Sequence, residues 1–182
     1  MTRRLAMACF VLTALANAGW AMEFSAEQTT RIGNRTMSGK IYFQPDRWRV
    51  EMASDEGPKI SINRLDKAVT WLLLPNRSYV ELPLRIDQVP RVGPKIDGEV
   101  ARKRLKTEVV GGRTTEKYEV TVESEKKKEI IYQWVAPDIK FAIKTASADG
   151  KWESVYSSVV MGPQKPQLFE VPAGYTKAPL PQ

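Results

Sequence analysis

The sequence contains no histidine, and its only cysteine is Cys9. Without an imidazole it has no Ser-His-Asp or Cys-His arrangement for nucleophilic catalysis. Without a second cysteine it forms no internal disulfide and no zinc site of the usual Cys/His kind. Glycine loops for phosphate and the carboxylate spacing of a calcium loop are also missing. We therefore predict a protein without metal or cofactor, stabilised by the burial of apolar side chains.

The first 21 residues have the pattern of a secretory signal peptide. Arg3 and Arg4 precede the uncharged apolar run 5–15. Small residues then place the cleavage site after Ala18 or after Ala21. The apolar run is shorter than the ~20 residues that a membrane-spanning helix needs. We predict export to a bacterial periplasm and a mature chain that begins near residue 22.

Cys9 lies inside this signal, so cleavage would remove it. Lipidation of Cys9 is a weaker alternative, because the preceding Ala6-Met7-Ala8 is a poor lipobox. The remaining ~160 residues suffice for one domain with a full core. The formal net charge of the whole chain is +7. This excess of positive charge favours either ordinary solubility or attraction to anionic lipid head groups and other polyanions.

Most of the chain after residue 22 alternates apolar and polar side chains with period two, the pattern of half-buried antiparallel strands. Turn signals such as Gly33-Asn34, Pro45-Asp46 and Gly111-Gly112 divide this pattern into short runs. The expected strands are 23–32, 35–44, 47–53, 59–64, 68–74, 77–82, 103–110, 113–124, 128–136, 139–147 and 151–160. We predict a mainly β fold, a single strongly curved antiparallel sheet in the form of a half-open barrel with ten to eleven strands.

The stretch 83–101 breaks the alternation, with three prolines and two glycines. It lies between the two groups of strands, so it is either a plain crossover or a loop, with or without a short helix, over the concave face of the sheet. The end of the chain is rich in proline. We expect one domain over 22–176 and a flexible tail over 177–182.

Candidate catalytic groups are few. Asp55-Glu56 and Glu123/Glu125 are candidate carboxylate pairs for glycoside cleavage. Both pairs fall in or beside expected turns, where carboxylates are usually solvated, and no serine lies in a nucleophile elbow. We predict that the protein is not an enzyme; a hydrolase built on carboxylates is the weak alternative.

Two basic runs are candidate contacts for an anionic surface. One comprises Arg102, Lys103, Arg104 and Lys106, and the other, Lys126-Lys127-Lys128, is placed at a hairpin tip. Arg47-Trp48-Arg49 superficially fits nucleic-acid binding. On a strand, however, Trp48 points away from both arginines, and the export signal argues further against a nucleic acid partner.

The strand expected over 68–74 is apolar on both faces, with Val69, Trp71 and Leu73 on one side and Leu72 and Leu74 on the other. A strand buried on both faces needs a cover on each. The segment is therefore either simple core or part of a concave apolar groove for a ligand such as an acyl chain.

Ser38 to Glu51 and Ala68 to Leu82 resemble a strand pair and the following hairpin of the LolA/LolB-like lipoprotein carriers. Leu168 to Tyr175 resembles the end of an uncharacterised exported subgroup of that fold. The resemblance implies a curved antiparallel sheet whose apolar cavity holds lipoprotein acyl chains. By position, Arg49 matches the family arginine after the proline turn. The family carriers open with an amphipathic helix, for which this chain has no room, so 83–101 is the only lid candidate.

We accordingly expect a periplasmic protein that binds a lipid, a lipoprotein acyl chain or another apolar ligand. The expected apolar lining is Trp48, Val50, Trp71, Leu73, Ile130, Tyr132 and Trp134. Arg49 would hold a lid closed by pairing with a loop carbonyl or acid. The alternative is an interaction or sensor module, or an accessory subunit, that docks on an inner- or outer-membrane protein or an anionic surface without a lipid.

Overall fold

The computed structural model describes residues 22–53, 59–85, 89–124 and 127–180. The expected signal peptide and the Asp55-Glu56 and Glu125 carboxylates lie outside these ranges. The strands are β1 (Phe24–Ile32), β2 (Arg35–Gln44), β3 (Arg47–Met52), β4 (Lys59–Arg64), β5 (Val69–Leu73), β6 (Ser78–Pro83), β7 (Glu99–Val110), β8 (Arg113–Ser124), β9 (Lys127–Ala136), β10 (Phe141–Ser147), β11 (Trp152–Met161) and β12 (Thr176–Lys177).

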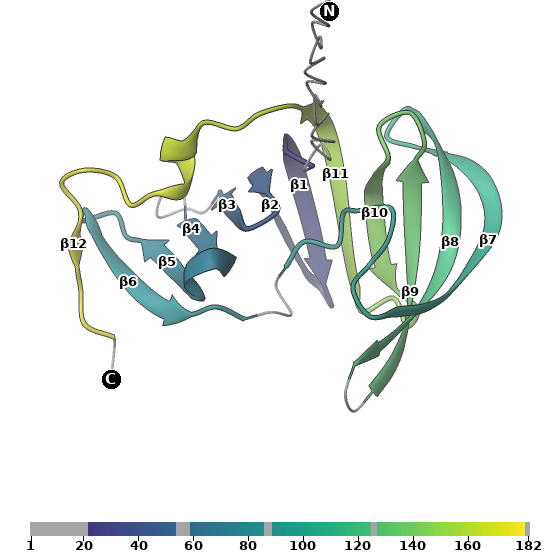
Figure 1. Ribbon diagram of the computed structural model, residues 1–182, viewed down its shortest axis with the longest axis horizontal. Coiled ribbons are helices and arrows are strands. Elements are labelled where there is room, and N and C mark those ends of the chain that lie inside the picture. The colour runs from purple at the N-terminus through teal and green to yellow at the C-terminus, as the bar shows by residue number, and fades with distance from the viewer. Residues whose placement is uncertain (1–21, 54–58, 86–88, 125–126, 181–182) are drawn as a thin grey trace, which may run out of the picture.

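All twelve strands belong to one sheet, in the order β12-β6-β5-β4-β3-β2-β1-β11-β10-β9-β8-β7 (Figure 1). The chain runs outward from β1 to β6, crosses over, and returns from β7 to β11, which pairs with β1. This confirms the predicted mainly β fold and its single curved sheet. Every pairing is antiparallel except that of β12 with β6. Because β12 is parallel to β6, the sheet is mixed. This strand was not predicted.

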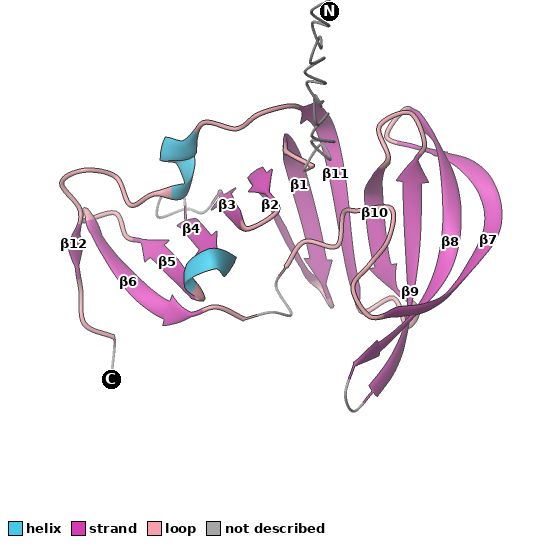
Figure 2. Cartoon of the chain, viewed as in Figure 1, coloured by secondary structure: helices cyan, strands magenta, loops and turns pink. Residues whose placement is uncertain are grey.

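Helical structure in the described residues is limited to two short 3-10 turns, η1 (Leu65–Lys67) and η3 (Pro166–Phe169) (Figure 2). Neither is long or apolar enough to span a membrane. β7 begins at Glu99, four residues before the expected start at 103. The described part of the crossover between β6 and β7 is irregular.

The curvature of the sheet has local causes. Pairing shifts by one residue between Ser25 and Glu27, between Ala142 and Lys144, and within β7. Such bulges bend a strand and increase its local twist. In β2, Gly39 lies so close to β3 that an added Cβ would collide with the carbonyl group of Glu51. Glycine at this position therefore permits the close approach of two backbones.

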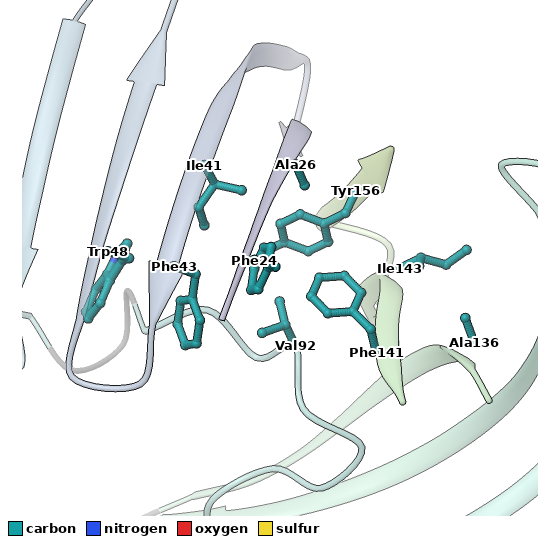
Figure 3. Packing of buried hydrophobic residues seen from close by; sticks show 10 residues of the cluster. All are labelled: Phe24, Ala26, Ile41, Phe43, Trp48, Val92, Ala136, Phe141, Ile143 and Tyr156. Carbon is teal, nitrogen blue, oxygen red and sulfur yellow. The ribbon is translucent and has the colours of Figure 1, made fainter. Parts of the chain in front are cut away.

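The main core lies on the concave face of the sheet. Phe24, Phe43 and Trp48 follow one another across β1, β2 and β3 in register. Phe141 and Tyr156 approach Phe24 edge-on, with ring centroids 4.6 and 6.3 Å away (Figure 3). Edge-to-face ring pairs add to the stabilisation that burial itself gives. Side chains from both halves of the sheet thus meet inside its curve.

Candidate functional site

The concave face is covered by residues 89–98, which we call the plug. Two of its side chains are buried, and each enters a different apolar cluster. Val92 packs into the cluster of Phe24, Phe43 and Phe141 (Figure 3). Ile96 packs with Val120, Val122 and Ile131 of β8 and β9. The plug therefore bridges the two halves of the concave face.

Backbone and side-chain hydrogen bonds fix the plug to the sheet. The Ala142 amide donates to the Val92 carbonyl at 2.9 Å. The fully buried Gln133 donates from Nε2 to the carbonyls of Arg91 and Gly93, at 3.1 and 3.2 Å. These bonds satisfy polar groups that would otherwise be costly to bury. Gln133 thus holds the backbone of the plug against the sheet, and we call it the plug anchor.

Arg102 and Glu99 continue this network at the end of the plug. The Arg102 guanidinium donates twice to the Glu99 carboxylate, at 2.8 and 2.7 Å, and once to Gln133 Oε1, at 2.9 Å. Glu99 also accepts the Ile96 amide at 3.2 Å. The hydrogen bond from Arg102 is the main cause that holds the pKa of Glu99 below its usual value of 4.5. Glu99 is therefore a charged partner for the plug at neutral pH.

The opposite, convex face has its own cover. Residues 163–175, which we call the strap, run from the end of β11 to β12 over β3, β4 and β5 (Figure 1). Phe169 of η3 is fully buried against Ile62, Trp71 and Leu73. The Arg47 guanidinium lies over the Phe169 ring, 5.3 Å from its centroid. This second cover makes the β5 strand buried on both faces.

Two arginines hold the backbone of the strap. Arg49 Nη1 donates to the Leu168 carbonyl at 3.3 Å, and its Nε donates to Glu51 at 2.6 Å. Arg64, which is 4% exposed, donates to the Phe169 carbonyl at 3.1 Å and pairs with Asp66 and Glu170. The hydrogen bond from Arg64 is the main cause that lowers the pKa of Asp66. Arg64 therefore ties the strap to η1.

Two hollows stand out in the described part of the molecule. One, of about 720 Å³, is lined by Gly112, Arg113, Thr114, Pro137 and Asp138. The other, of about 130 Å³, lies between β1, β2 and β11. Neither has a plug residue or an aromatic ring of the concave cluster in its lining. Protein side chains fill the concave face in this structure.

The seven residues expected to line one groove do not lie together. Trp48 and Val50 belong to the concave cluster, whereas Trp71 and Leu73 lie on the convex face under the strap. The register of β4 explains the separation. Trp48 pairs with Asn63, and Trp71 pairs with the adjacent residue Ile62. Because adjacent residues of a strand point to opposite faces, the two tryptophans do too. A single lining made of both tryptophans is therefore absent.

The three β9 residues also point outward. Ile131 and Gln133 contact the plug side, so Ile130, Tyr132 and Trp134 face away from it. Ile130 is 46% exposed. Lys117 Nζ lies 4.5 Å from the ring centroids of both Tyr132 and Trp134. The pattern misled the prediction because the inner face of β9 carries the polar Gln133 beside Ile131, whereas Trp134 is buried on the outer face.

The remaining predicted site residues have clear positions. Arg49 does pair with a loop carbonyl, but in the strap and not in the 83–101 stretch. Arg102 turns inward to Glu99, while Lys103, Arg104 and Lys106 are exposed along β7. Sequence reasoning placed 83–101 over the concave face and singled out Leu168 to Tyr175, but it missed the roles of Val92, Ile96 and Gln133 and the contact of the strap with the convex face. The proline-rich composition of both covering segments was one signal for them.

No family model and no curated protein matches the chain. Solved structures do. An uncharacterized conserved protein from Thermus thermophilus is similar over 87% of this chain and 91% of its own, with a TM-score of 0.58 and 11% identity. MucB in complex with MucA(peri) is similar over 87% of this chain, with a TM-score of 0.53 and 13% identity. In the Pseudomonas aeruginosa MucA/MucB complex the TM-score is 0.50.

This chain matches little more than half of the MucB chain, 57% and 55% of it in the two complexes. A putative outer membrane lipoprotein-sorting protein domain from Vibrio parahaemolyticus also matches, with a TM-score of 0.36 and 12% identity over 80% of this chain and 88% of its own. The sheet, curved and open around an internal segment, has the architecture that the sequence resemblance implied. The chain shares this fold with the Thermus thermophilus protein and with MucB. Within it, the plug lies inside the curve, and the strap covers the outside.

Proposed function

We propose that the protein is a non-enzymatic envelope protein that binds the acyl chain of a lipid or lipoprotein on the concave face, and that the plug fills this face when no ligand is bound. One observation carries the proposal. Among the buried residues of the two concave clusters, only Val92 and Ile96 lie outside the strands. Withdrawal of the plug would therefore leave two apolar surfaces that belong to the sheet alone.

The energies of the two occupants favour an exchange. Burial of a valine or isoleucine side chain contributes about 1.5–3 kcal/mol, and each buried methylene of an acyl chain about 0.8 kcal/mol. The plug hydrogen bonds add about 1 kcal/mol each. A long acyl chain buries more apolar surface than Val92 and Ile96 together. Its burial can therefore offset the loss of the plug contacts.

The test combines lipid extraction with a binding assay. We expect acyl lipid in extracts of protein purified from its native envelope, and saturable displacement of a fluorescent apolar probe by palmitate. No extracted lipid together with no saturable displacement would refute the proposal.

A disulfide between Val92→Cys and Ala142→Cys supplies the matched control. Their backbones are joined by a hydrogen bond, so the two residues are neighbours, and the expected mature chain has no other cysteine. The oxidised variant should not bind the probe, and reduction should restore binding. Equal binding by the oxidised and reduced forms would show that the plug does not gate the site.

A docking module is the second candidate function. The packing of the plug into the concave clusters favours it, because the two main hollows of the described residues lie away from the plug, and the similar MucB structure was solved in complex with MucA(peri). In this case we expect one envelope protein to co-purify without lipid, and the oxidised Val92→Cys/Ala142→Cys variant to bind that partner as well as the reduced form does.

A further inference from the structure

The two edges of the sheet are different. At one edge, β12 pairs with Ser78 and Tyr79 of β6, and the Ala178 amide donates to the Tyr79 carbonyl at 2.8 Å. At the other edge, β7 ends the sheet over twelve residues, and no described segment pairs with its outer side. A free strand edge presents unpaired backbone donors and acceptors to another chain.

The free edge is basic. Lys103 has no ion-pair partner among the described residues, and Arg104 and Lys106 use Glu116 and Glu108 in exposed pairs. Such exposed pairs contribute little and are easily exchanged. Val100 and Val109, near the two ends of β7, are 55% and 69% exposed. The edge therefore offers positive charge in its middle and apolar surface at both ends.

A second copy of this chain does not fit the same edge. Antiparallel pairing of two β7 strands would place the basic stretch 102–106 opposite itself. Like charges directly opposite each other destabilise a strand pair. The bulge between Arg104 and Lys106 further distorts a long self-pairing. The charge pattern thus selects against the same sequence and in favour of an acidic one.

We propose that β7 is a strand-addition site for an extended, acidic segment of a partner protein. The segment would pair its backbone with the free edge and place carboxylates beside Lys103 and Lys106. Apolar side chains near its ends would cover Val100 and Val109. Backbone pairing supplies affinity in this mode of recognition, and the side chains supply specificity. The site does not depend on an acyl ligand, because the plug lies on the concave face and the partner segment would lie beside the sheet.

The experiment uses a labelled peptide of alternating glutamate and valine, about as long as β7, with a lysine–valine peptide as the control for charge. Fluorescence anisotropy should show saturable binding of the acidic peptide only. Hydrogen exchange should show new protection of β7 amides in the complex. Protection elsewhere, binding of both peptides, or no binding of the acidic peptide would overturn the proposal.

Two double variants test the charges. Lys103→Glu with Lys106→Glu should weaken binding of the acidic peptide by about tenfold or more. Arg35→Glu with Lys59→Glu changes the net charge equally at exposed positions on β2 and β4 and should leave binding nearly unchanged. Equal losses in both would indicate non-specific attraction and refute the site. Protection of β7 by dimerisation without peptide would instead assign the edge to a second copy.

Discussion

Trp48 and Trp71 point to opposite faces of the sheet, although only β4 lies between their strands. Trp48 is opposite Asn63, and Trp71 is opposite Ile62, so neighbouring residues of β4 assign the two rings to different faces. Trp48 belongs to the concave cluster that also contains Val92 of the plug, and Trp71 packs in the cluster of Phe169 of the strap. The two faces can therefore be altered separately.

Phe169→Ala tests this separation. Phe169 is fully buried under the strap, and replacement of a buried phenylalanine by alanine costs about 3–5 kcal/mol of unfolding free energy. We expect this loss in urea denaturation, but an unchanged affinity for the apolar probe in the folded variant. A large fall in probe affinity would place the ligand on the convex face.

Gln133→Ala tests the plug anchor. The substitution leaves the Arg91 and Gly93 carbonyls without their donor, and an unsatisfied buried group costs about 1–3 kcal/mol. We expect that loss in unfolding free energy and faster hydrogen exchange at the Ala142 amide. Gln28→Ala is the matched control, because the Gln28 side chain bonds to Thr30 and Tyr156 and not to the plug. Equal exchange at Ala142 in both variants would contradict the assigned role of Gln133.

Glu99→Gln tests the ionic end of the plug through pH. The folded-state pKa of Glu99 lies below 4.5, mainly because of the hydrogen bond from Arg102. Its contribution to stability is therefore complete above pH 4.5 and is lost as the pH falls through the lower folded-state value. We expect wild type to exceed Glu99→Gln in unfolding free energy near neutral pH, and the two to converge in acid. A pH-independent difference would show that the charge of Glu99 is not involved.

Arg64→Lys tests the strap. A lysine keeps the charge but lacks the planar fork that reaches Asp66, Glu170 and the Phe169 carbonyl together. We expect a loss of about 1–3 kcal/mol in unfolding free energy and faster chymotryptic cleavage after Phe169 in the strap. Arg113→Lys, at the exposed pair with Asp138, should cost at most about 1 kcal/mol. Similar losses in the two variants would remove the special role of Arg64.

Period-two alternation predicted eleven of the twelve strands because half-buried strands carry that pattern in their own residues. β12 has only two residues, and its pairing with β6 depends on the path of the strap, so nothing local marks it. β7 begins early, at Glu99, because residues 99–102 pair with β8 across a bulge, and a bulge interrupts the alternation from which the strand start was predicted.

The candidate site was less predictable, because alternation separates two faces but does not say which face is concave. Ile130, Tyr132 and Trp134 share a side as expected, yet Gln133 between them is the residue that faces the plug. Arg49 was expected to bond to a carbonyl or an acid of a covering loop. The carbonyl that it contacts belongs to Leu168 of the strap, 119 residues further along the chain. The role proposed for Arg49 is therefore to hold the strap.

The pairing of β12 with β6 limits the size of any assembly that this sheet can form. The protein's own C-terminal segment pairs with β6 at Ser78 and Tyr79, so β7 is the long free edge for pairing with another chain. Once β7 has taken up one acidic strand, that edge is no longer free, and the pairing stops. Its complexes by strand addition should therefore have a fixed one-to-one stoichiometry and should not grow into fibrils.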